Sequence, residues 1–123
     1  MIHGIGVDLC DIDRMERALL QKGFREKVFS EEEISYAEKS RSAAKHYASA
    51  FAAKEALAKA TGWGLYGNGL DSCYIKRSES GPSFVFTPQF AAKLSSIGVN
   101  KVFLSLSHER AMAVAMVVLE KDA

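Results

Sequence analysis

The sequence lacks the marks of several protein classes. No apolar run in its 123 residues reaches the roughly 20 residues that a membrane-spanning helix needs. Cys10 and Cys73 form no Cys-x-x-Cys pair, and no histidine stands beside them in metal-ligand register, so we expect reduced thiols and no zinc site. The first residues lack the basic start and the long apolar stretch of a signal peptide. We therefore expect a soluble, cytoplasmic protein.

Neither sign of charge is in large excess. The 16 Lys and Arg residues nearly balance the 15 Asp and Glu residues, which leaves a formal net charge of +1. Such a chain has no strong overall field to attract a nucleic acid or a membrane surface, although residues 14–27 form a local basic stretch. Apolar residues make up 48% and charged residues 25%, as in ordinary globular proteins. The length suits a single domain, 1–123, with its own core.

Two catalytic motifs are also absent. The glycine-rich segment 62–69 lacks the spacing and the Lys-Ser/Thr ending of a phosphate-binding loop, so we expect it to be a turn that leads into a strand. Ser107 has no Gly-x-Ser-x-Gly frame. Ser107 and His108 are neighbours in an expected strand and point to opposite faces, which argues against a serine hydrolase.

Caps and hydrophobic spacing predict the helices and strands that the sequence does contain. Helices are expected at 11–20, at 30–38 behind a Ser30–Glu33 capping box, at 42–61 with Gly62 as its stop, and from Thr87 and Pro88 to about Ser96. Strands are expected in the first residues up to Asp8 and at 70–77, 83–86, 101–107 and 111–120. The middle two strands form a hairpin with a somewhat long connection at 78–82.

The helix at 42–61 is rich in alanine and carries two charges beside a narrow strip of small residues. Glu55 and Lys59 are one turn apart and share a face with Ala48 and Ala52. An ordinary surface ion pair is the simplest interpretation of this spacing. The small residues predict that another element approaches this face closely. We expect an α+β fold in which the long Ala-rich helix packs on a small, largely antiparallel sheet.

A lone carboxylate, Asp8, ends the first apolar run. An acid at the carboxyl end of a strand and Glu55 on a helix are the donors that one divalent cation can share. Mg²⁺ takes one or two protein carboxylates and completes its shell with water and substrate phosphate oxygens. A turn residue is the alternative interpretation of Asp8.

The last expected strand, at 111–119, is apolar on both faces. A helix on one face and a second subunit on the other would account for this pattern. Helices of the same chain on both faces are the alternative.

Three segments taken together resemble a known family. They are Gly6-Val7-Asp8 with Arg14, Phe51-Ala52-Ala53-Lys54-Glu55-Ala56 with Lys59-Ala60, and Ser105-Leu106-Ser107-His108. In order and spacing they closely resemble the short, single-domain phosphopantetheinyl transferases, the holo-acyl-carrier-protein synthase family. That family transfers the phosphopantetheine arm of coenzyme A to a serine of an acyl carrier protein in fatty acid biosynthesis, releases adenosine 3′,5′-bisphosphate and uses Mg²⁺. The resemblance also implies a homotrimer with active sites at subunit boundaries.

The resemblance assigns a role to each matching residue. Asp8 and Glu55 are implied to bind the metal, and Lys59 to neutralise phosphate charge or protonate the leaving group. Coenzyme contacts are implied for Lys54, Lys59, Gly81, Pro82, Ser107 and His108. The basic residues Arg14, Arg17, Lys22 and Arg25 are implied to dock the acidic carrier protein, with a solvated helix face as the alternative for the last three.

The chain departs from the family pattern at two places. Ala50 stands where the family usually has an arginine before the Phe51 motif, so a phosphate-facing cation is missing unless Lys45, His46 or Lys54 replaces it. Gly81 and Pro82 are adjacent where the family usually has Gly-x-Pro. Both departures bear on coenzyme affinity more than on reaction type. Ala50 is also the hint for an alternative function, a non-catalytic nucleotide- or carrier-protein-binding module of the same fold.

Overall fold

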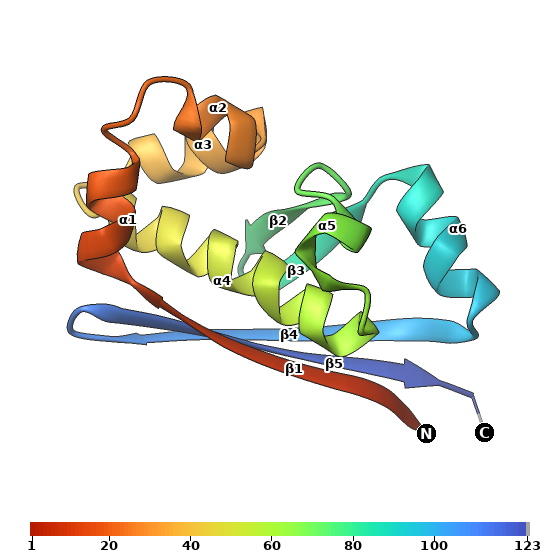
Figure 1. Cartoon of the computed structure of the whole chain (residues 1–123). Helices are drawn as coiled ribbons and strands as arrows, with labels where there is room; N and C mark the ends of the chain where they lie inside the picture. The colour runs from red at the N-terminus through yellow and green to blue at the C-terminus, as the bar shows by residue number, and fades with distance from the viewer. Residues whose placement is uncertain (123) are drawn as a thin grey trace.

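A three-stranded antiparallel sheet and one long helix form the frame of the molecule. The structure, a computed structural model, describes residues 1–122. In the sheet, β5 (Met112–Lys121) lies between β1 (Ile2–Asp11) and β4 (Val99–Glu109), so β1 and β4 are the two edges. Helix α4 (Ala43–Thr61) packs along one face of this sheet, and Figure 1 shows the other helices on the same side. The opposite face of the sheet is therefore bare in a single chain.

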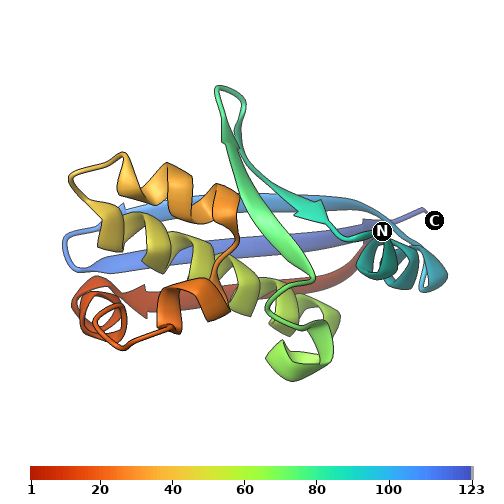
Figure 2. The same ribbon diagram turned by 90° about the horizontal axis from the view of Figure 1, so that it is seen from above.

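The remaining elements cover α4 from above. Between β1 and α4 lie α1 (Ile12–Ala18), α2 (Phe24–Val28) and α3 (Glu31–Glu38). After α4 come α5 (Gly64–Asn68), β2 (Cys73–Ser78), β3 (Gly81–Phe86) and α6 (Pro88–Ser96). Strands β2 and β3 form a separate antiparallel pair. Seen from above, this hairpin rises between α3 and α6 (Figure 2).

The alternating pattern of β5 divides the two faces of the sheet. Ala113, Ala115, Val117 and Leu119 point toward α4 and are fully buried. Met116 points the other way, and 47% of its surface is exposed. Successive side chains of a strand alternate between faces, so an apolar residue at every position gives a strand with two apolar faces. Only one of them has a partner within the described part of the chain.

Strand β1 lies against the backbone of α4 because both surfaces are made of very small residues. A Cβ atom at Gly6 would collide with the carbonyl oxygen of Ala56, and one at Gly4 with that of Ala60. Glycine is the residue that permits such a close backbone approach. The close contact predicted from the alanine strip is confirmed, and its partner is β1.

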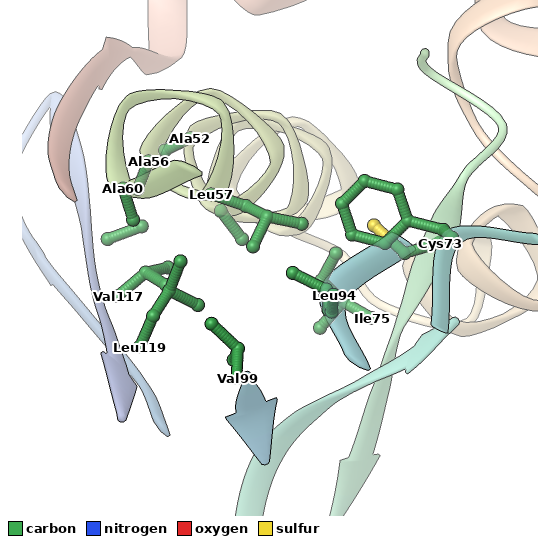
Figure 3. Close-up of a cluster of buried hydrophobic side chains, with 13 residues drawn as sticks. Ala52, Ala56, Leu57, Ala60, Cys73, Ile75, Leu94, Val99, Val117 and Leu119 are labelled. Carbon is green, nitrogen blue, oxygen red and sulfur yellow. The ribbon is translucent and has the colours of Figure 1, made fainter. Parts of the chain in front are cut away.

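The main core lies where α4, the sheet, the β2–β3 hairpin and α6 meet. Leu57 of α4 is at its centre, with Ile75 from β2 and Leu94 from α6 on one side and Val117 and Leu119 from β5 on the other (Figure 3). All five side chains are at most 4% exposed. Burial of side chains of this size supplies about 1.5–3 kcal/mol each, so this cluster fixes the hairpin and α6 onto α4.

The principal helices agree with the sequence predictions. The Ser30–Glu33 capping box is present, Gly62 ends α4 in a left-handed conformation with φ 77°, and Thr87 caps α6. The fold class, an Ala-rich helix on an antiparallel sheet, is confirmed. None of the helices within residues 1–122 combines the length and the apolar character needed to cross a membrane.

Several boundaries were predicted wrongly. Asp8 does not end its strand, because β1 continues to Asp11, and His108 and Glu109 belong to β4 instead of a connection. The β2–β3 connection is short, since Ser78 already pairs with Gly81. The glycine-rich segment contains the short helix α5, and α2 was not predicted. A helix of five residues has too few turns to produce a hydrophobic period, which explains both omissions.

Candidate active site

Three of the predicted functional residues meet at the edge of the sheet formed by β1. The ammonium group of Lys59 donates a hydrogen bond to Asp8 Oδ1 at 3.0 Å and another to the Val7 carbonyl at 3.1 Å. Glu55 lies one turn before Lys59 on α4, and its pKa responds to both charges. The side chain of Asp8 is 18% exposed and that of Lys59 is 55% exposed. The group is therefore partly buried at Asp8 and accessible to solvent at Lys59.

The electrostatics of this group favour a further positive charge. Burial raises the pKa of Glu55, the nearby negative charge of Asp8 raises it further, and Lys59 opposes the rise. Two carboxylates that share a site repel each other unless a cation lies between them. Lys59 supplies only one positive charge for two acids. The donor set therefore fits a divalent cation that accepts carboxylate oxygens.

The two acids do not form a complete metal cage. Within residues 1–122 no third Asp, Glu, His or Cys joins them in a metal-binding cluster. This is the composition expected for Mg²⁺, which keeps several waters and takes the remaining oxygens from phosphate groups.

The close packing of β1 on α4 brings the acids together. Gly4, Gly6 and Asp8 point to the same face of β1, because their positions differ by two. The contact between Gly6 and Ala56 brings this face down onto the helix. Asp8 is the next inward position after Gly6, and Glu55 precedes Ala56. The site is thus fixed by the backbone contact beside it.

Apart from Lys59, the residues assigned to coenzyme binding lie elsewhere on the chain. His108 is on β4, paired with Ala113 of β5, and Pro82 of β3 pairs with Arg77 of β2. The guanidinium of Arg77 donates a hydrogen bond to the carbonyl of His46 on α4, at 3.4 Å. The positive charges of Arg77, Lys45 and His108 add to burial in lowering the pKa of His46. These residues form one neighbourhood, which we call the β4-edge group.

The β4-edge group is well separated from Asp8, Glu55 and Lys59. His46 and Glu55 are nine positions apart on α4, which is about two and a half turns and about 13 Å along the axis, so they project from opposite sides. Strands β1 and β4 are separated by β5, a distance of about 10 Å across the sheet. A single chain therefore presents two half-sites that face away from each other.

Ser107 and Lys54 differ from the other assigned residues in their surroundings. Ser107 is exposed and lies on the face of β4 opposite that of His108. Lys54 is 3% exposed and donates hydrogen bonds to Glu33 Oε1, the Val28 carbonyl and the Leu70 carbonyl at 2.9, 3.0 and 3.3 Å. All three ammonium hydrogens have protein acceptors. A phosphate-binding role for Lys54 does not fit this geometry.

The basic residues at and after the first helix are not equivalent. Arg14, Arg17 and Lys22 are exposed. Arg25 is half-buried, lies 3.2 Å from a carboxylate oxygen of Glu38 and rests over the ring of Tyr47 at 5.5 Å. Its charge is already paired, so Arg25 is a weaker docking candidate than the other three.

Arg14 lies closest to the acidic group. Burial raises the pKa of the Cys10 thiol to about 11, Asp8 and Glu55 contribute to the rise, and Arg14 opposes it. The Cys10 thiol therefore lies near both acids and near Arg14, so the start of α1 is beside Asp8 and Glu55.

Sequence reasoning missed Arg77. Its signal was available, because Arg77 lies two positions beyond the buried Ile75 on β2 and therefore on the inward side of that strand. A cation at an inward strand position is unusual and points to a functional or paired group.

Comparison with known proteins identifies the family of this chain. The chain belongs to the 4′-phosphopantetheinyl transferase superfamily, whose family model matches residues 4–115. Within it, the chain is 44% identical to the holo-[acyl-carrier-protein] synthase of Cytophaga hutchinsonii, over 99% of this chain and 100% of that protein. It is 40% identical to that of Geotalea daltonii, over 98% and 100%. The family predicted from the sequence is confirmed.

Solved structures give the same result. The crystal structure of the holo-[acyl-carrier-protein] synthase from Neisseria meningitidis matches with a TM-score of 0.89 and 33% identity, over 98% of this chain and 100% of that one. The synthase from Bacillus anthracis, crystallised in complex with CoA (3′,5′-ADP), matches with a TM-score of 0.82 and 31% identity over 99% of each chain.

Proposed function

We propose that this chain is a cytoplasmic holo-acyl-carrier-protein synthase of fatty acid biosynthesis. It moves the 4′-phosphopantetheine group of coenzyme A onto a serine of an apo acyl carrier protein and releases adenosine 3′,5′-bisphosphate. The observation that carries the proposal is the convergence of Asp8, Glu55 and Lys59 in a chain of this family. Two acids and one cation are the residue types that phosphoryl transfer requires.

Lys59 stabilises the leaving group. In the reaction the serine oxygen bonds to the β-phosphorus of coenzyme A, while the bond from that phosphorus to the oxygen bridging to the α-phosphate breaks. Negative charge develops on this bridging oxygen. The Lys59 ammonium is held by Asp8 and the Val7 carbonyl and remains open to solvent, so it can pair with that charge and donate a proton to it.

Glu55 is suited to accept the proton of the attacking serine. Burial and Asp8 raise the pKa of Glu55 when no metal is bound, so the oxygen of Glu55 that does not hold Mg²⁺ is the one suited to accept this proton. A water molecule held by Asp8 is the alternative acceptor.

Asp8 and Glu55 would also hold Mg²⁺. Their paired oxygens fit its preference for carboxylates, and they leave positions for water and for diphosphate oxygens. When bound, Mg²⁺ supplies charge neutralisation to the diphosphate.

The carrier protein would dock on α1, with Arg14 as the main contact and Arg17 and Lys22 beside it. All three cations are exposed, and Arg14 lies next to the acidic group, where an acidic partner would deliver its serine. Arg14→Glu should raise the apparent KM for carrier protein far more than that for coenzyme A. Lys39→Glu, a charge reversal at the far end of α3, is the matched control and should change neither. Equal effects of Arg14→Glu on both substrates would indicate a structural role.

The working form would be a homotrimer that joins the two half-sites. The bare face of the sheet carries Ile5, Val7, Leu9, Phe103 and Met116, each 47–62% exposed. A patch of this kind on a soluble protein marks an interface. A closed ring would set the β1 edge of one subunit against the β4 edge of the next, and one coenzyme A would then contact both groups. In one chain the groups are too far apart for that, since a single ribose separates the diphosphate from the 3′-phosphate.

The decisive experiment is a mass measurement on the carrier. Protein, coenzyme A, Mg²⁺ and an apo carrier protein are mixed, and the carrier should gain the mass of phosphopantetheine. Asp8→Asn and Glu55→Gln keep the side-chain shape, remove one charge each and should abolish most transfer without unfolding. Full activity of either variant at saturating Mg²⁺ would reject the metal assignment. A wild-type protein that binds coenzyme A but yields no mass gain would support the non-catalytic binding module instead.

A further inference from the structure

Positively charged and titratable basic side chains outnumber acids in the β4-edge group. Lys45, His46, Arg77 and His108 gather there, and none of them lies in an ion pair with a carboxylate of residues 1–122. The nearest buried acid, Glu33, whose charge acts on Arg77, is itself bound to Lys54 at 2.9 Å. Positive groups that crowd together without a counter-charge attract an anion.

Arg77 is held in place but only weakly hydrogen-bonded. Its guanidinium lies over the ring of Tyr36 at 5.0 Å, and its hydrogen bond to the His46 carbonyl is long at 3.4 Å. The ring of His46 also packs edge-on against Tyr36, with 4.9 Å between the two ring centroids. Most of the five N–H donors of the guanidinium therefore remain available, on a side chain whose stacking already fixes its orientation.

Arg77 borders the space that Ala50 leaves open. A small hollow is lined by Ala50, His46 and Tyr36 together with Arg77 and three further residues. A long side chain at position 50 would fill this hollow from the helix. With alanine there, a guanidinium reaches the same place from β2. The cation is therefore supplied by a different element of the fold.

We infer that Arg77, supported by His46 and His108, binds the 3′-phosphate of coenzyme A and sets the preference for coenzyme A over dephospho-coenzyme A. This inference rests on the proposed function. The acids of the other half-site suit the diphosphate, because a divalent cation can bridge them to it. The remaining phosphate is a dianionic monoester, which the planar fork of an arginine binds best. Arg77 also pairs with Pro82 of the hairpin to which coenzyme contacts were assigned.

The test compares the affinity of two ligands for the full-length protein by calorimetry. Wild-type protein should bind coenzyme A more tightly than dephospho-coenzyme A. Arg77→Gln should weaken coenzyme A binding by about tenfold to a hundredfold, as expected for lost charged hydrogen bonds, and leave dephospho-coenzyme A within about twofold. Unchanged binding of the second ligand also shows that the variant is folded. Lys76→Gln, the exposed neighbour on the other side of β2, is the control and should change neither affinity.

A second variant tests the relation to position 50. Ala50→Arg in the Arg77→Gln background should restore the preference for coenzyme A, because the new guanidinium enters the same hollow. Failure to restore it would overturn the claim that Arg77 replaces a cation at position 50. Equal weakening of both ligands by Arg77→Gln, or no weakening, would overturn the 3′-phosphate assignment. Binding is read without turnover, so a wild-type protein that shows the preference but transfers nothing would keep this inference and reject the proposed function.

Discussion

The contact between Gly6 and Ala56 predicts that one methyl group on β1 will disable the site. In Gly6→Ala the new Cβ would meet the Ala56 carbonyl oxygen and lie 2.8 Å from its carbon and 2.9 Å from the Ala60 nitrogen. All of these are backbone atoms of a helix, which cannot rotate away as a side chain can. Since non-bonded carbon atoms sit about 3.5–4.0 Å apart, β1 must move from α4 by about 1 Å.

The cost has two parts. Overpacking against a rigid backbone is at the upper end of its usual range, about 3 kcal/mol, and the stiffer unfolded chain of an alanine variant returns up to about 1 kcal/mol. We therefore expect a net loss of about 2 kcal/mol in the free energy of unfolding. A displacement of about 1 Å between Asp8 and Glu55 should lower transfer about a hundredfold. Urea unfolding gives the first quantity and the carrier mass assay the second.

Gly98→Ala is the matched control. Gly98 has a φ of 84° and its nearest neighbour atom is 3.7 Å away on the Lys121 side chain, so an alanine there is strained without pushing β1. It should cost about 1–2 kcal/mol and leave transfer unchanged. If Gly6→Ala matched this control in activity, the backbone contact would not be what sets the geometry of the acids.

Three further predictions concern the core, the β4-edge group and the bare sheet face. Lys54→Met should lower the free energy of unfolding in urea by about 3–5 kcal/mol, because Glu33 is left charged and buried. Adding Glu33→Gln to this variant should recover part of the loss. If the single and the double variant lost the same free energy, the two side chains would not interact. Burial and the charges of Arg77, Lys45 and His108 lower the pKa of His46 below the usual 6.5, so the unfolded chain takes up this proton first and the free energy of unfolding falls as the pH drops below about 6.5. His46→Gln should make this fall less steep in unfolding curves measured at several pH values. An unchanged slope would exclude His46 as its source. Met116→Lys should dissociate the proposed trimer in sedimentation and abolish transfer together, whereas a stable, active monomer would refute the shared site.

Local signals predicted the parts of the fold that local chemistry determines. The Ser30–Glu33 capping box and the Thr87 cap need only residues three positions apart, and both are present. Other contacts of Glu33 could not be predicted. Its second oxygen accepts the Ile75 N–H at 2.9 Å, a pairing across 42 positions that depends on how β2 packs.

The candidate site shows the same division. The motif around Glu55 suggested Lys59, which contacts Asp8 in the structure, but it also suggested Lys54, which is adjacent to Glu55. Adjacent positions on a helix differ by about 100° in direction, so Lys54 points to Glu33 while Glu55 points to β1. Helical geometry alone could have separated them, and it could also have set His46 and Glu55 on opposite sides of α4 from their spacing of nine.

The proposed trimer would give the bare apolar face a role that follows from the division of charge across the sheet. Acids that suit a metal and a diphosphate lie at the β1 edge, and cations that suit a phosphate monoester lie at the β4 edge. If both groups lay on one edge of one chain, Asp8 and Glu55 would pair with Arg77, and neither group would be free for a ligand. Separation by about 10 Å of sheet keeps the two carboxylates from pairing with Arg77. In the proposed trimer the two edges would meet between subunits around a coenzyme molecule, so the apolar face would be as necessary for catalysis as the acids.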